Sequence, residues 1–312
     1  MNGIELSRKF YETYGKPMLE RDFPEIADRI AAGICGQGSE CYGYNDEVSL
    51  DHDFQAGFWL WMTREDEEKF GFKLMRAYNA LPKHFEGVEL QQKNRNNAAK
   101  FGVTVIEDFY ERLIGLSRPP KTEQEWLCLP DYALSQATNG EVFCDKLGAF
   151  SAFRSALCAM PVDVRKKKVA ARLAVMAQTG QYNFSRCFSH GEIAGASLCL
   201  SRFCEQAVAV THALQGSYAP FYKWLLRSLD GLENTAELKQ NLEFLLTAET
   251  SKNTFARKQD IIESIASNLT KQLNALGWSN AENTYLEAQA YAVTDGIQSR
   301  FLRGLHIFDG ID

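Results

Sequence analysis

The spacing of hydrophobic positions along the chain changes near residue 160. Before this point, short apolar runs alternate with segments that carry apolar residues on one helical face. After it, apolar residues recur at three- and four-residue intervals almost to the C-terminal end. Short apolar runs predict strands, and the later periodicity predicts amphipathic helices. We therefore expect an α+β fold, with a small mixed sheet and flanking helices followed by an all-α helical bundle.

In the first half, the apolar runs predict strands at residues 29–35, 103–105 and 141–144, and one bent strand or a pair of strands within 49–62. Helices are predicted at 4–15, from 63 to 81 and at 108–114. Gly15 and Pro17 are expected to end the first helix, and the pair Thr122 and Glu125 forms a capping-box pattern that predicts a further helix start.

In the second half, the periodicity predicts helices at 162–178, 191–214, 221–229, 237–249, 258–276 and 283–302. Glycines close several of these segments and are expected to stop them, Gly180 and Gly216 among them. Seven of the eight prolines lie at or before Pro161. This change of pattern predicts two domains, residues 1–150 and residues 151–312.

Composition and charge narrow the class of protein. The chain has 312 residues, of which 45% are hydrophobic and 24% charged, so disordered and fibrous classes are excluded. Residues 1–150 carry 17 basic and 25 acidic side chains, a net −8, and residues 151–312 carry 17 and 15, a net +2. The total of −6 excludes an indiscriminate nucleic-acid coat, which would be basic. It does not exclude an anionic ligand of limited size.

The spacing of the cysteines and the first residues of the chain indicate the cellular compartment. The eight cysteines form no CxxC pair, and the histidines form no HExxH motif. Charges occupy the positions where a signal peptide would need an apolar stretch. We expect a cytoplasmic protein without a membrane segment, whose cysteines are small buried hydrophobes. The basic run at residues 165–168 is expected to lie on a solvated helix face.

One segment combines residues that can carry chemistry. The predicted strand at 29–35 leads into Gly36-Gln37-Gly38-Ser39, and Asp51-His52-Asp53 follows twelve residues later. A glycine-serine turn after a strand presents backbone N–H groups and a hydroxyl to an anion. Asp51 and Asp53, two positions apart in an extended stretch, project from one face. Two adjacent carboxylates repel each other unless a cation lies between them, and Mg²⁺ suits such a pair together with phosphate oxygens.

These motifs resemble the signature of the DNA-polymerase-β-like nucleotidyltransferase superfamily. The run at residues 38–53 looks like the domain-of-unknown-function family 4037, which is placed in that superfamily. The stretches at 141–148, 180–186 and 218–225 look like the same family, so the resemblance spans about residues 4–230. It implies a small mixed sheet with flanking helices and a helical domain that closes over the nucleotide.

The resemblance also implies roles for particular residues. Gly38 and Ser39 would hold the β- and γ-phosphates, and Asp51 and Asp53 would ligate two Mg²⁺ ions. A third catalytic carboxylate is expected on a neighbouring strand, where Glu89 is the best match and Glu107 the alternative. Among the cations of the second half, Lys223 and Arg186 would bind the triphosphate.

The function that follows is transfer of a nucleoside monophosphate from a nucleoside triphosphate to an acceptor hydroxyl, with Mg²⁺. The acidic total charge favours a small-molecule or protein acceptor over a nucleic acid. The alternative is a catalytically inactive nucleotide-binding or scaffold protein with the same fold, because neither candidate for the third carboxylate matches the pattern closely.

Overall fold

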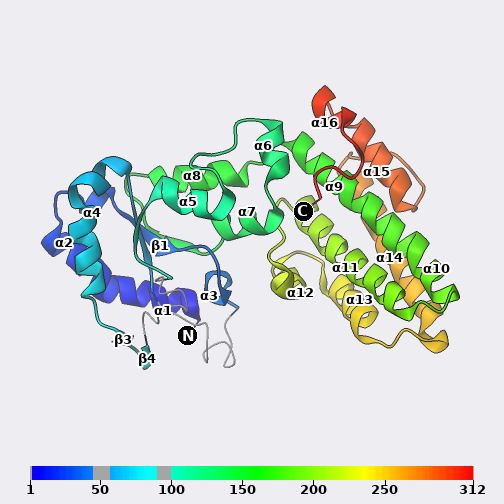
Figure 1. The fold of residues 1–312 in the computed structure, drawn as a ribbon, viewed down its shortest axis with the longest axis horizontal. Coiled ribbons are helices and arrows are strands. Elements are labelled where there is room, and N and C mark those ends of the chain that lie inside the picture. The colour runs from blue at the N-terminus through cyan, green and yellow to red at the C-terminus, as the bar shows by residue number, and fades with distance from the viewer. Residues whose placement is uncertain (1, 45–56, 90–99, 312) are drawn as a thin grey trace. The chain divides into compact units, whose positions relative to one another are not determined.

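The computed structural model describes residues 2–44, 57–89 and 100–311, and it divides into two compact units (Figure 1). Unit 1 contains residues 1–120 and 136–159, and unit 2 contains residues 121–135 and 160–312. The chain therefore does not divide at a single point near residue 150. Segment 121–135 is part of unit 2, where Asp131 forms ion pairs with two cations of a later helix.

Unit 1 contains a four-stranded sheet, a two-stranded ribbon and the helices around them. The sheet strands are β1 (Ala31–Ile34), β2 (Trp59–Met62), β5 (Val103–Val105) and β6 (Glu141–Cys144), and the ribbon strands are β3 (His84–Phe85) and β4 (Val88–Glu89). The helices are α1 (Gly3–Phe10), α2 (Lys16–Asp22), α3 (Ser39–Tyr42), α4 (Arg64–Asn79), α5 (Ile106–Ile114) and α8 (Ala149–Cys158), and α7 (Asp131–Thr138) runs from unit 2 into unit 1.

The sheet has the order β5-β2-β1-β6 and is mixed. Strand β1 is antiparallel to β2 and β6, and β2 is parallel to β5. Side chains alternate between the two faces of β2, as a pleated strand requires. Leu60 and Met62 join a core with residues of α1, α2 and α4, whereas the Trp61 ring stacks on Phe150 of α8, 3.8 Å between centroids. The predicted α+β class with a small mixed sheet is confirmed.

The register gathers several connections at one end of this sheet. Gly33, near the end of β1, is opposite Trp59 at the start of β2, and Ile34 is opposite Glu141 at the start of β6. Because β5 runs parallel to β2, its first residue, Val103, lies at the same end. The turn after β1 and the segments that precede β2, β5 and β6 therefore meet there.

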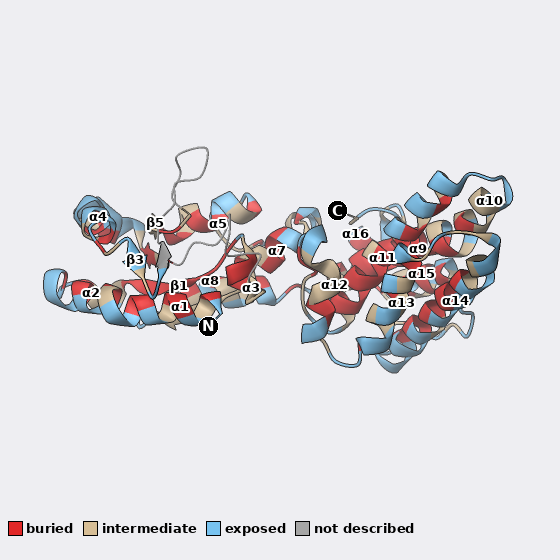
Figure 2. Cartoon of the chain, turned by 90° about the horizontal axis from the view of Figure 1, so that it is seen from below, coloured by how far each residue is buried: buried red, intermediate tan, exposed pale blue. Residues whose placement is uncertain are grey.

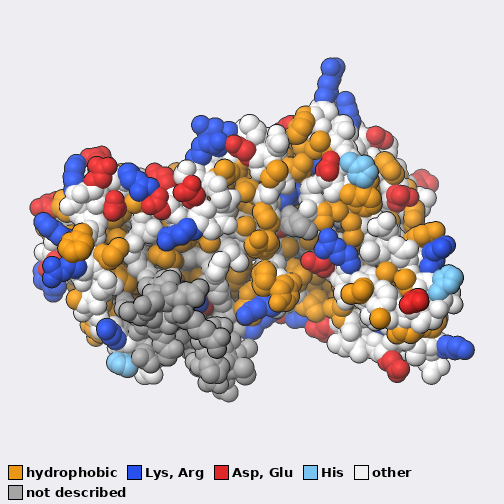
Figure 3. Space-filling view, in the orientation of Figure 1, with side chains coloured by type: hydrophobic (Ala, Val, Ile, Leu, Met, Phe, Trp, Pro, Cys, Tyr) orange, Lys and Arg blue, Asp and Glu red, His pale blue; other side chains and the backbone are white. Residues whose placement is uncertain are grey.

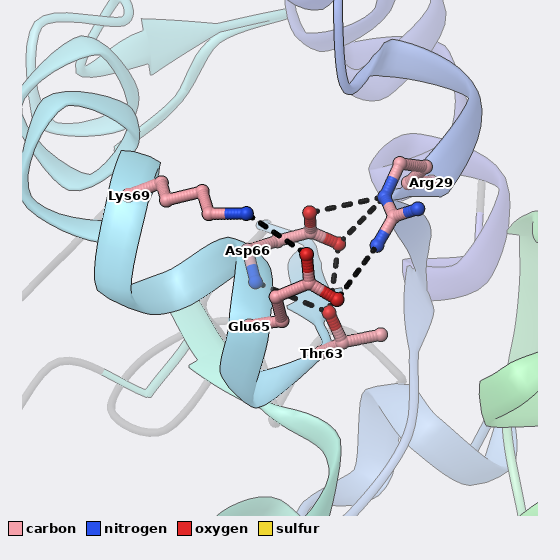
Figure 4. Close-up of polar contacts among 5 residues, drawn as sticks. All are labelled: Arg29, Thr63, Glu65, Asp66 and Lys69. Carbon is pink, nitrogen blue, oxygen red and sulfur yellow. Dashed lines mark hydrogen bonds and ion pairs between the residues drawn. The ribbon is translucent and has the colours of Figure 1, made fainter.

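A network of polar side chains holds the opposite end of the sheet (Figure 4). Asp66, buried in the first turn of α4, accepts hydrogen bonds from Arg29 Nε at 2.9 and 3.0 Å and from the Thr63 hydroxyl at 2.7 Å. Thr63 in turn caps α4 by accepting from the Asp66 backbone N–H. Glu65 pairs with Lys69 at 2.8 Å. These bonds tie the residue preceding β1 to the helix that follows β2.

The predicted end of the first helix is wrong. The chain continues from α1 through a π-helical turn (Tyr11–Gly15) into α2, with Pro17 in the first turn of α2, where its missing N–H is tolerated. Gly15 serves for close packing, because a Cβ at this position would lie 2.5 Å from the Phe58 ring. Gly15 therefore permits close packing against Phe58 and does not stop the helix.

Unit 2 is a bundle of helices around one apolar core (Figure 2). Its elements are α6 (Glu123–Cys128), α9 (Val162–Met176), a π-helical segment (Ala177–Asn183), α10 (Phe184–Ser189), α11 (Ile193–Leu214), a 3₁₀ turn (Tyr222–Trp224), α12 (Leu225–Ser228), α13 (Ala236–Thr247), α14 (Lys252–Ala275), α15 (Leu286–Asp295) and α16 (Arg300–Gly304). The buried residues of α9 and α11 form the centre of the core. The predicted helices at 221–229 and 283–302 are each broken into shorter pieces.

Gly180, like Gly15, permits close packing and does not end a helix. It was expected to end the helix that begins at residue 162, but the chain continues through the π-helical segment into α10. A Cβ at Gly180 would lie 2.3 Å from the Phe203 ring of α11. The absent side chain therefore allows the two helices to pack closely. Gly216, by contrast, has φ +75° directly after α11 and does mark a helix end.

The basic run of α9 also differs from the prediction of a solvated face. Lys167 and Lys168 are 0% and 1% exposed. The Lys167 ammonium donates to the His306 carbonyl at 2.6 Å, and the Lys168 ammonium donates to the Leu129 carbonyl at 2.6 Å. Carbonyls and a carboxylate from segments distant in the sequence replace the water that these cations would otherwise bind.

Helix α11 is long and apolar enough to cross a membrane by length and composition alone. Half of its most apolar window is buried, and the helix packs against α9, α10 and α13. These contacts are those of a core helix in a bundle.

Candidate functional site

The turn between β1 and α3, residues 36–39, is called here the glycine turn. Gly36 and Gly38 adopt φ values of +120° and +115°, which strain a residue that has a side chain. The Asn139 amide holds the turn from the loop before β6: its Oδ1 accepts from the Gly36 N–H at 2.9 Å, and its Nδ2 donates to the Gly36 carbonyl at 2.8 Å. The Trp59 indole N–H donates to the Cys35 carbonyl at 3.2 Å.

The glycine turn has donors available for a ligand. No described residue accepts a hydrogen bond from the backbone N–H groups of Gln37, Gly38 or Ser39. A Cβ on Gly38 would lie 2.5 Å from the Glu40 carboxylate and 2.6 Å from the Lys100 ammonium. Glu40 and Lys100 form an ion pair beside the turn, and Glu40 is 1% exposed. The positive φ of Gly38 therefore favours glycine, and a side chain there would also have to displace the ends of Glu40 and Lys100.

A cavity of about 220 Å³ opens beside the glycine turn and is called the turn cavity. Gly36 and Gln37 line one part of it, and Trp59, Lys100 and Arg112 contribute further side chains. The Arg112 guanidinium lies 5.7 Å from the centre of the Trp59 ring and donates to the Thr104 hydroxyl at 2.8 Å. No described acidic side chain pairs with Arg112. With Lys100 paired to Glu40, the described lining of the turn cavity has one positive charge in excess, that of Arg112.

Sequence reasoning did not find Arg112 or Lys100. Both are single cations outside any motif, and only the parallel pairing of β2 with β5 brings the segment containing them to the glycine turn. The one sequence signal is the position of Lys100 just before a predicted strand. That position does not indicate which turn the strand approaches.

The predicted metal ligands Asp51 and Asp53 lie outside the described residues. The chain that contains them leads into β2, which starts at the end of the sheet where the glycine turn lies. Among the described residues, no three His, Cys, Asp or Glu side chains gather into a metal-binding group. The residues that would bind Mg²⁺ thus remain a prediction from the sequence.

The two candidates for the third carboxylate lie in different places. Glu89 is in β4, paired in register with His84 of β3, so it belongs to the ribbon and not to the four-stranded sheet. Glu107 follows β5 at the end opposite the glycine turn, because Val103 and not Val105 lies at the turn's end of the sheet. Its Oε2 is buried without a described hydrogen-bond partner.

Arg186 and Lys223, the predicted triphosphate-binding cations, are exposed residues of unit 2. The Arg186 guanidinium lies 5.1 Å from the Tyr182 ring centre, and the Lys223 ammonium lies 4.5 Å from the Trp224 ring centre. Neither forms an ion pair with a described acidic residue. Both therefore keep their charge available at the surface of unit 2.

The cysteines near the glycine turn are not activated nucleophiles. Burial raises the pKa of the Cys35 thiol to about 12. Burial and the neighbouring Glu40 carboxylate also raise the pKa of the Cys41 thiol. Both thiols stay protonated at neutral pH, and the thiolate is the reactive form. The prediction of small buried cysteines holds for these two and for Cys204, but it is wrong for Cys128 and Cys158, which are exposed.

Unit 2 contains a second group of titratable residues, which are buried. Asp131 accepts from the Lys168 ammonium and from the Arg172 guanidinium, each at 2.9 Å. Burial opposes the ionisation of Asp131, but the two cations outweigh it and lower the pKa of the carboxyl. Nearby, burial lowers the pKa of His212 to about 4, so its ring is neutral at pH 7. The ring is held between the hydroxyls of Ser217 and Ser228 at 2.8 and 2.7 Å.

Comparisons with known proteins bear on residues 126–225. The family described as Domain of unknown function (DUF4037) matches this range, which includes the buried charges of unit 2. A structure of a nucleotidyltransferase-like protein from Exiguobacterium sibiricum aligns over 90% of both chains at 12% identity, with a TM-score of 0.37. No curated protein matches the chain. Residues 126–225 are thus similar to the family that the sequence motifs resembled.

Proposed function

We propose that the protein is a Mg²⁺-dependent nucleotidyltransferase whose triphosphate binds at the glycine turn. The observation that carries this proposal is the combination of unpartnered backbone N–H groups at residues 37–39 with the excess positive charge of Arg112 in the adjoining turn cavity. Backbone N–H groups and a guanidinium are the donors that recognise phosphate oxygens.

In the proposed reaction, an acceptor hydroxyl oxygen bonds to the α-phosphorus of a nucleoside triphosphate. The bond from that phosphorus to the bridging oxygen breaks, pyrophosphate leaves and the hydroxyl proton is released. Asp51 and Asp53 would hold Mg²⁺, which supplies Lewis-acid stabilisation of the phosphate charge. Gly38 and Ser39 would orient the β- and γ-phosphates, and Arg186 and Lys223 are proposed as further nucleotide-binding cations.

The acceptor is proposed to be a small molecule or a protein in the cytoplasm. The face of the molecule seen in Figure 3 carries acidic and basic side chains interspersed, with no continuous basic stripe over the described residues. A polyanionic acceptor such as a nucleic acid would favour such a stripe.

The experiment is a pyrophosphate-release assay with the double variant Asp51→Asn, Asp53→Asn. Removal of both carboxylate charges should abolish pyrophosphate release and Mg²⁺-dependent nucleotide binding. Asp22→Asn is the matched control, because this surface aspartate of the same unit pairs only with its neighbour Arg21. Unchanged turnover in the double variant would refute the mechanism.

A non-catalytic nucleotide-binding protein is the second candidate, favoured by the position of Glu89 outside the four-stranded sheet. Thermal-shift measurements against the four ribonucleoside triphosphates, with and without Mg²⁺, separate the candidates when followed by the pyrophosphate assay. Binding without turnover on every acceptor tried supports the non-catalytic protein, and absence of binding counts against both.

A further inference from the structure

A second cavity, of about 230 Å³, lies wholly within unit 2 and is called the helical cavity. The first residues of α7, the middle of α9 and α11, and the segment before α12 form its walls. Its polar lining includes Asp131, Arg172 and Gln206, and its aromatic lining consists of Tyr132, Phe221 and Tyr222. All of these residues lie within the range that matches DUF4037.

Gln206 is the unusual member of this lining. Its side chain is buried, with the residue 4% exposed, and its Oε1 has no hydrogen-bond partner among the described residues. A buried amide carbonyl without a donor loses its hydration and gains nothing in return. Gln206 lines the cavity, and a turn of its amide about the last side-chain bond exchanges Oε1 and Nε2, so that a ligand N–H group in the cavity can supply the missing donor.

The aromatic side chains give the cavity a second recognition element. The Tyr132 and Phe221 rings are 6.0 Å apart in an edge-to-face arrangement, and the Phe221 and Tyr222 rings are 4.4 Å apart. All three side chains are large and yet 39–70% exposed. Exposed aromatic residues that gather beside a cavity offer ring faces on which a flat ligand can stack.

Each charged side chain of the lining already has an ion-pair partner in the protein. Asp131 is paired with Lys168 and Arg172, and Glu205 is paired with Arg202 at 2.6 Å. A strongly anionic or cationic ligand would therefore have to displace an existing ion pair. The helical cavity favours a neutral ligand, because every described charged side chain of its lining is already in an ion pair, whereas Arg112 of the turn cavity has no described acidic partner.

We propose that the helical cavity binds a neutral, planar heteroaromatic base that carries an exocyclic amino group, of the adenine type. The amide of a glutamine presents an acceptor and a donor side by side, which matches the amino group and ring nitrogen of adenine. The exposed aromatic rings stack on the face of the base. This inference deepens the proposed function and rests on it in one respect, since a nucleoside triphosphate carries such a base.

The test on the unaltered protein compares two ligands that differ by one amino group. Isothermal titration without Mg²⁺ measures the affinity of the full chain for adenosine and for purine riboside, which lacks the exocyclic amine. Purine riboside should bind about tenfold more weakly or worse, because the Gln206 carbonyl would stay unpaired. The absence of phosphate and Mg²⁺ separates this outcome from a failure of the proposed transfer reaction.

Two variants extend the test, each with a matched control. Gln206→Leu should lower adenosine affinity about tenfold and abolish the preference over purine riboside. Gln289→Leu is its control, because Gln289 is equally buried but bonds to backbone carbonyls outside the cavity lining. Phe221→Leu should also weaken adenosine about tenfold through lost stacking, whereas Phe72→Leu, at an exposed phenylalanine of unit 1, should not.

Three results would overturn the proposal: no measurable adenosine binding, equal affinity for adenosine and purine riboside, or adenosine affinity unchanged in both cavity variants. Equal affinities would mean that water satisfies the Gln206 carbonyl. If Gln206→Leu does not fold, the ligand comparison on the unaltered protein and the Phe221→Leu variant still decide the matter.

Discussion

The turn cavity of unit 1 and the helical cavity of unit 2 have nearly the same volume, about 220 and 230 Å³, but opposite chemistry. The turn cavity lies beside backbone N–H donors, and Arg112 in its lining has no acidic partner among the described residues. In the helical cavity each charged lining residue has an ion-pair partner, and one amide carbonyl, Gln206 Oε1, has no donor among the described residues. Among the described residues, the turn cavity thus has hydrogen-bond donors without acceptors, and the helical cavity has an acceptor without a donor.

This difference shows how each unit limits what it can bind. Phosphate oxygens supply acceptors, and an aminated base supplies a donor. Each cavity therefore matches one chemical class of ligand within its own unit: phosphate in unit 1 and an aminated base in unit 2. The buried charged residues Asp131, Lys168 and Arg172 stabilise the wall of the helical cavity, because they form ion pairs with one another.

Asp131→Asn is expected to have the largest effect on stability. The substitution would leave Lys168 and Arg172 buried without their carboxylate, which costs about 3–5 kcal/mol of unfolding free energy. Urea unfolding at pH 7 measures the loss. Asp230→Asn is the control, because Asp230 pairs with Lys239 at the surface, and it should cost about 1 kcal/mol or less. A small loss in Asp131→Asn would mean that the ion pairs of Asp131 contribute little to the unfolding free energy.

The pH dependence of unfolding should report the neutral His212 ring. Burial lowers its pKa to about 4 from the ordinary histidine pKa of 6.5, so the unfolded chain binds more protons than the folded chain between these values. Its contribution is therefore fully present above pH 6.5 and falls by about 3 kcal/mol as the pH drops to 4. His212→Gln should lose stability at pH 7 and flatten this slope, as measured by urea unfolding at several pH values.

The control for the pH experiment is His190→Gln, because His190 is exposed. This variant should keep the slope of the unaltered protein. A slope that persists unchanged in His212→Gln would show that other groups cause the loss between pH 6.5 and 4.

Gly38→Ala should destabilise unit 1 more than Gly36→Ala. Both positions have positive φ, but only at Gly38 would the new Cβ meet Glu40 and Lys100, since nothing lies within 4 Å of a Cβ at Gly36. We expect a cost of about 1–3 kcal/mol at Gly38 and about 1 kcal/mol at Gly36. Thermal unfolding gives the order, and equal losses would show that the Glu40–Lys100 pair yields without cost.

The sequence was sufficient for the features that depend on neighbours along the chain. It predicted β1, β5 and β6, and the caps made by Thr63 and Thr122, because strand length and capping are local. Gly15 and Gly180 were misinterpreted because their partners, Phe58 and Phe203, are distant in the sequence. The same glycine pattern can end a helix or permit close packing.

The candidate site was predictable only in part, for a similar reason. The glycine turn is a local motif, and its two positive φ values agree with its glycines. Lys168 appeared solvated because its partner Asp131 lies 37 positions earlier. Arg112 and Gln206 belong to no sequence motif, and only the cavities that they line identify them as candidate binding residues. The roles of Asp51 and Asp53 stay predictions, since both lie outside the described residues.

Arg112→Gln should have the smallest effect on stability, within about 1 kcal/mol, because the side chain is exposed. It should nevertheless lower the affinity for inorganic tripolyphosphate about tenfold, since a charge-assisted hydrogen bond is lost. Arg76→Gln is a matched control: Arg76 is also exposed in unit 1 and also lies over an aromatic ring, that of Phe72. Equal losses in both variants would indicate a general charge effect.

The division of roles between the two cavities is tested most directly by a crossed titration. Calorimetry measures the binding of inorganic tripolyphosphate with Mg²⁺, and of adenosine without it, to Arg112→Gln and Gln206→Leu. We predict that Arg112→Gln weakens only tripolyphosphate and Gln206→Leu weakens only adenosine, each about tenfold. If each variant weakens both ligands equally, or if neither variant changes either affinity, the assignment of phosphate to the turn cavity and base to the helical cavity is contradicted.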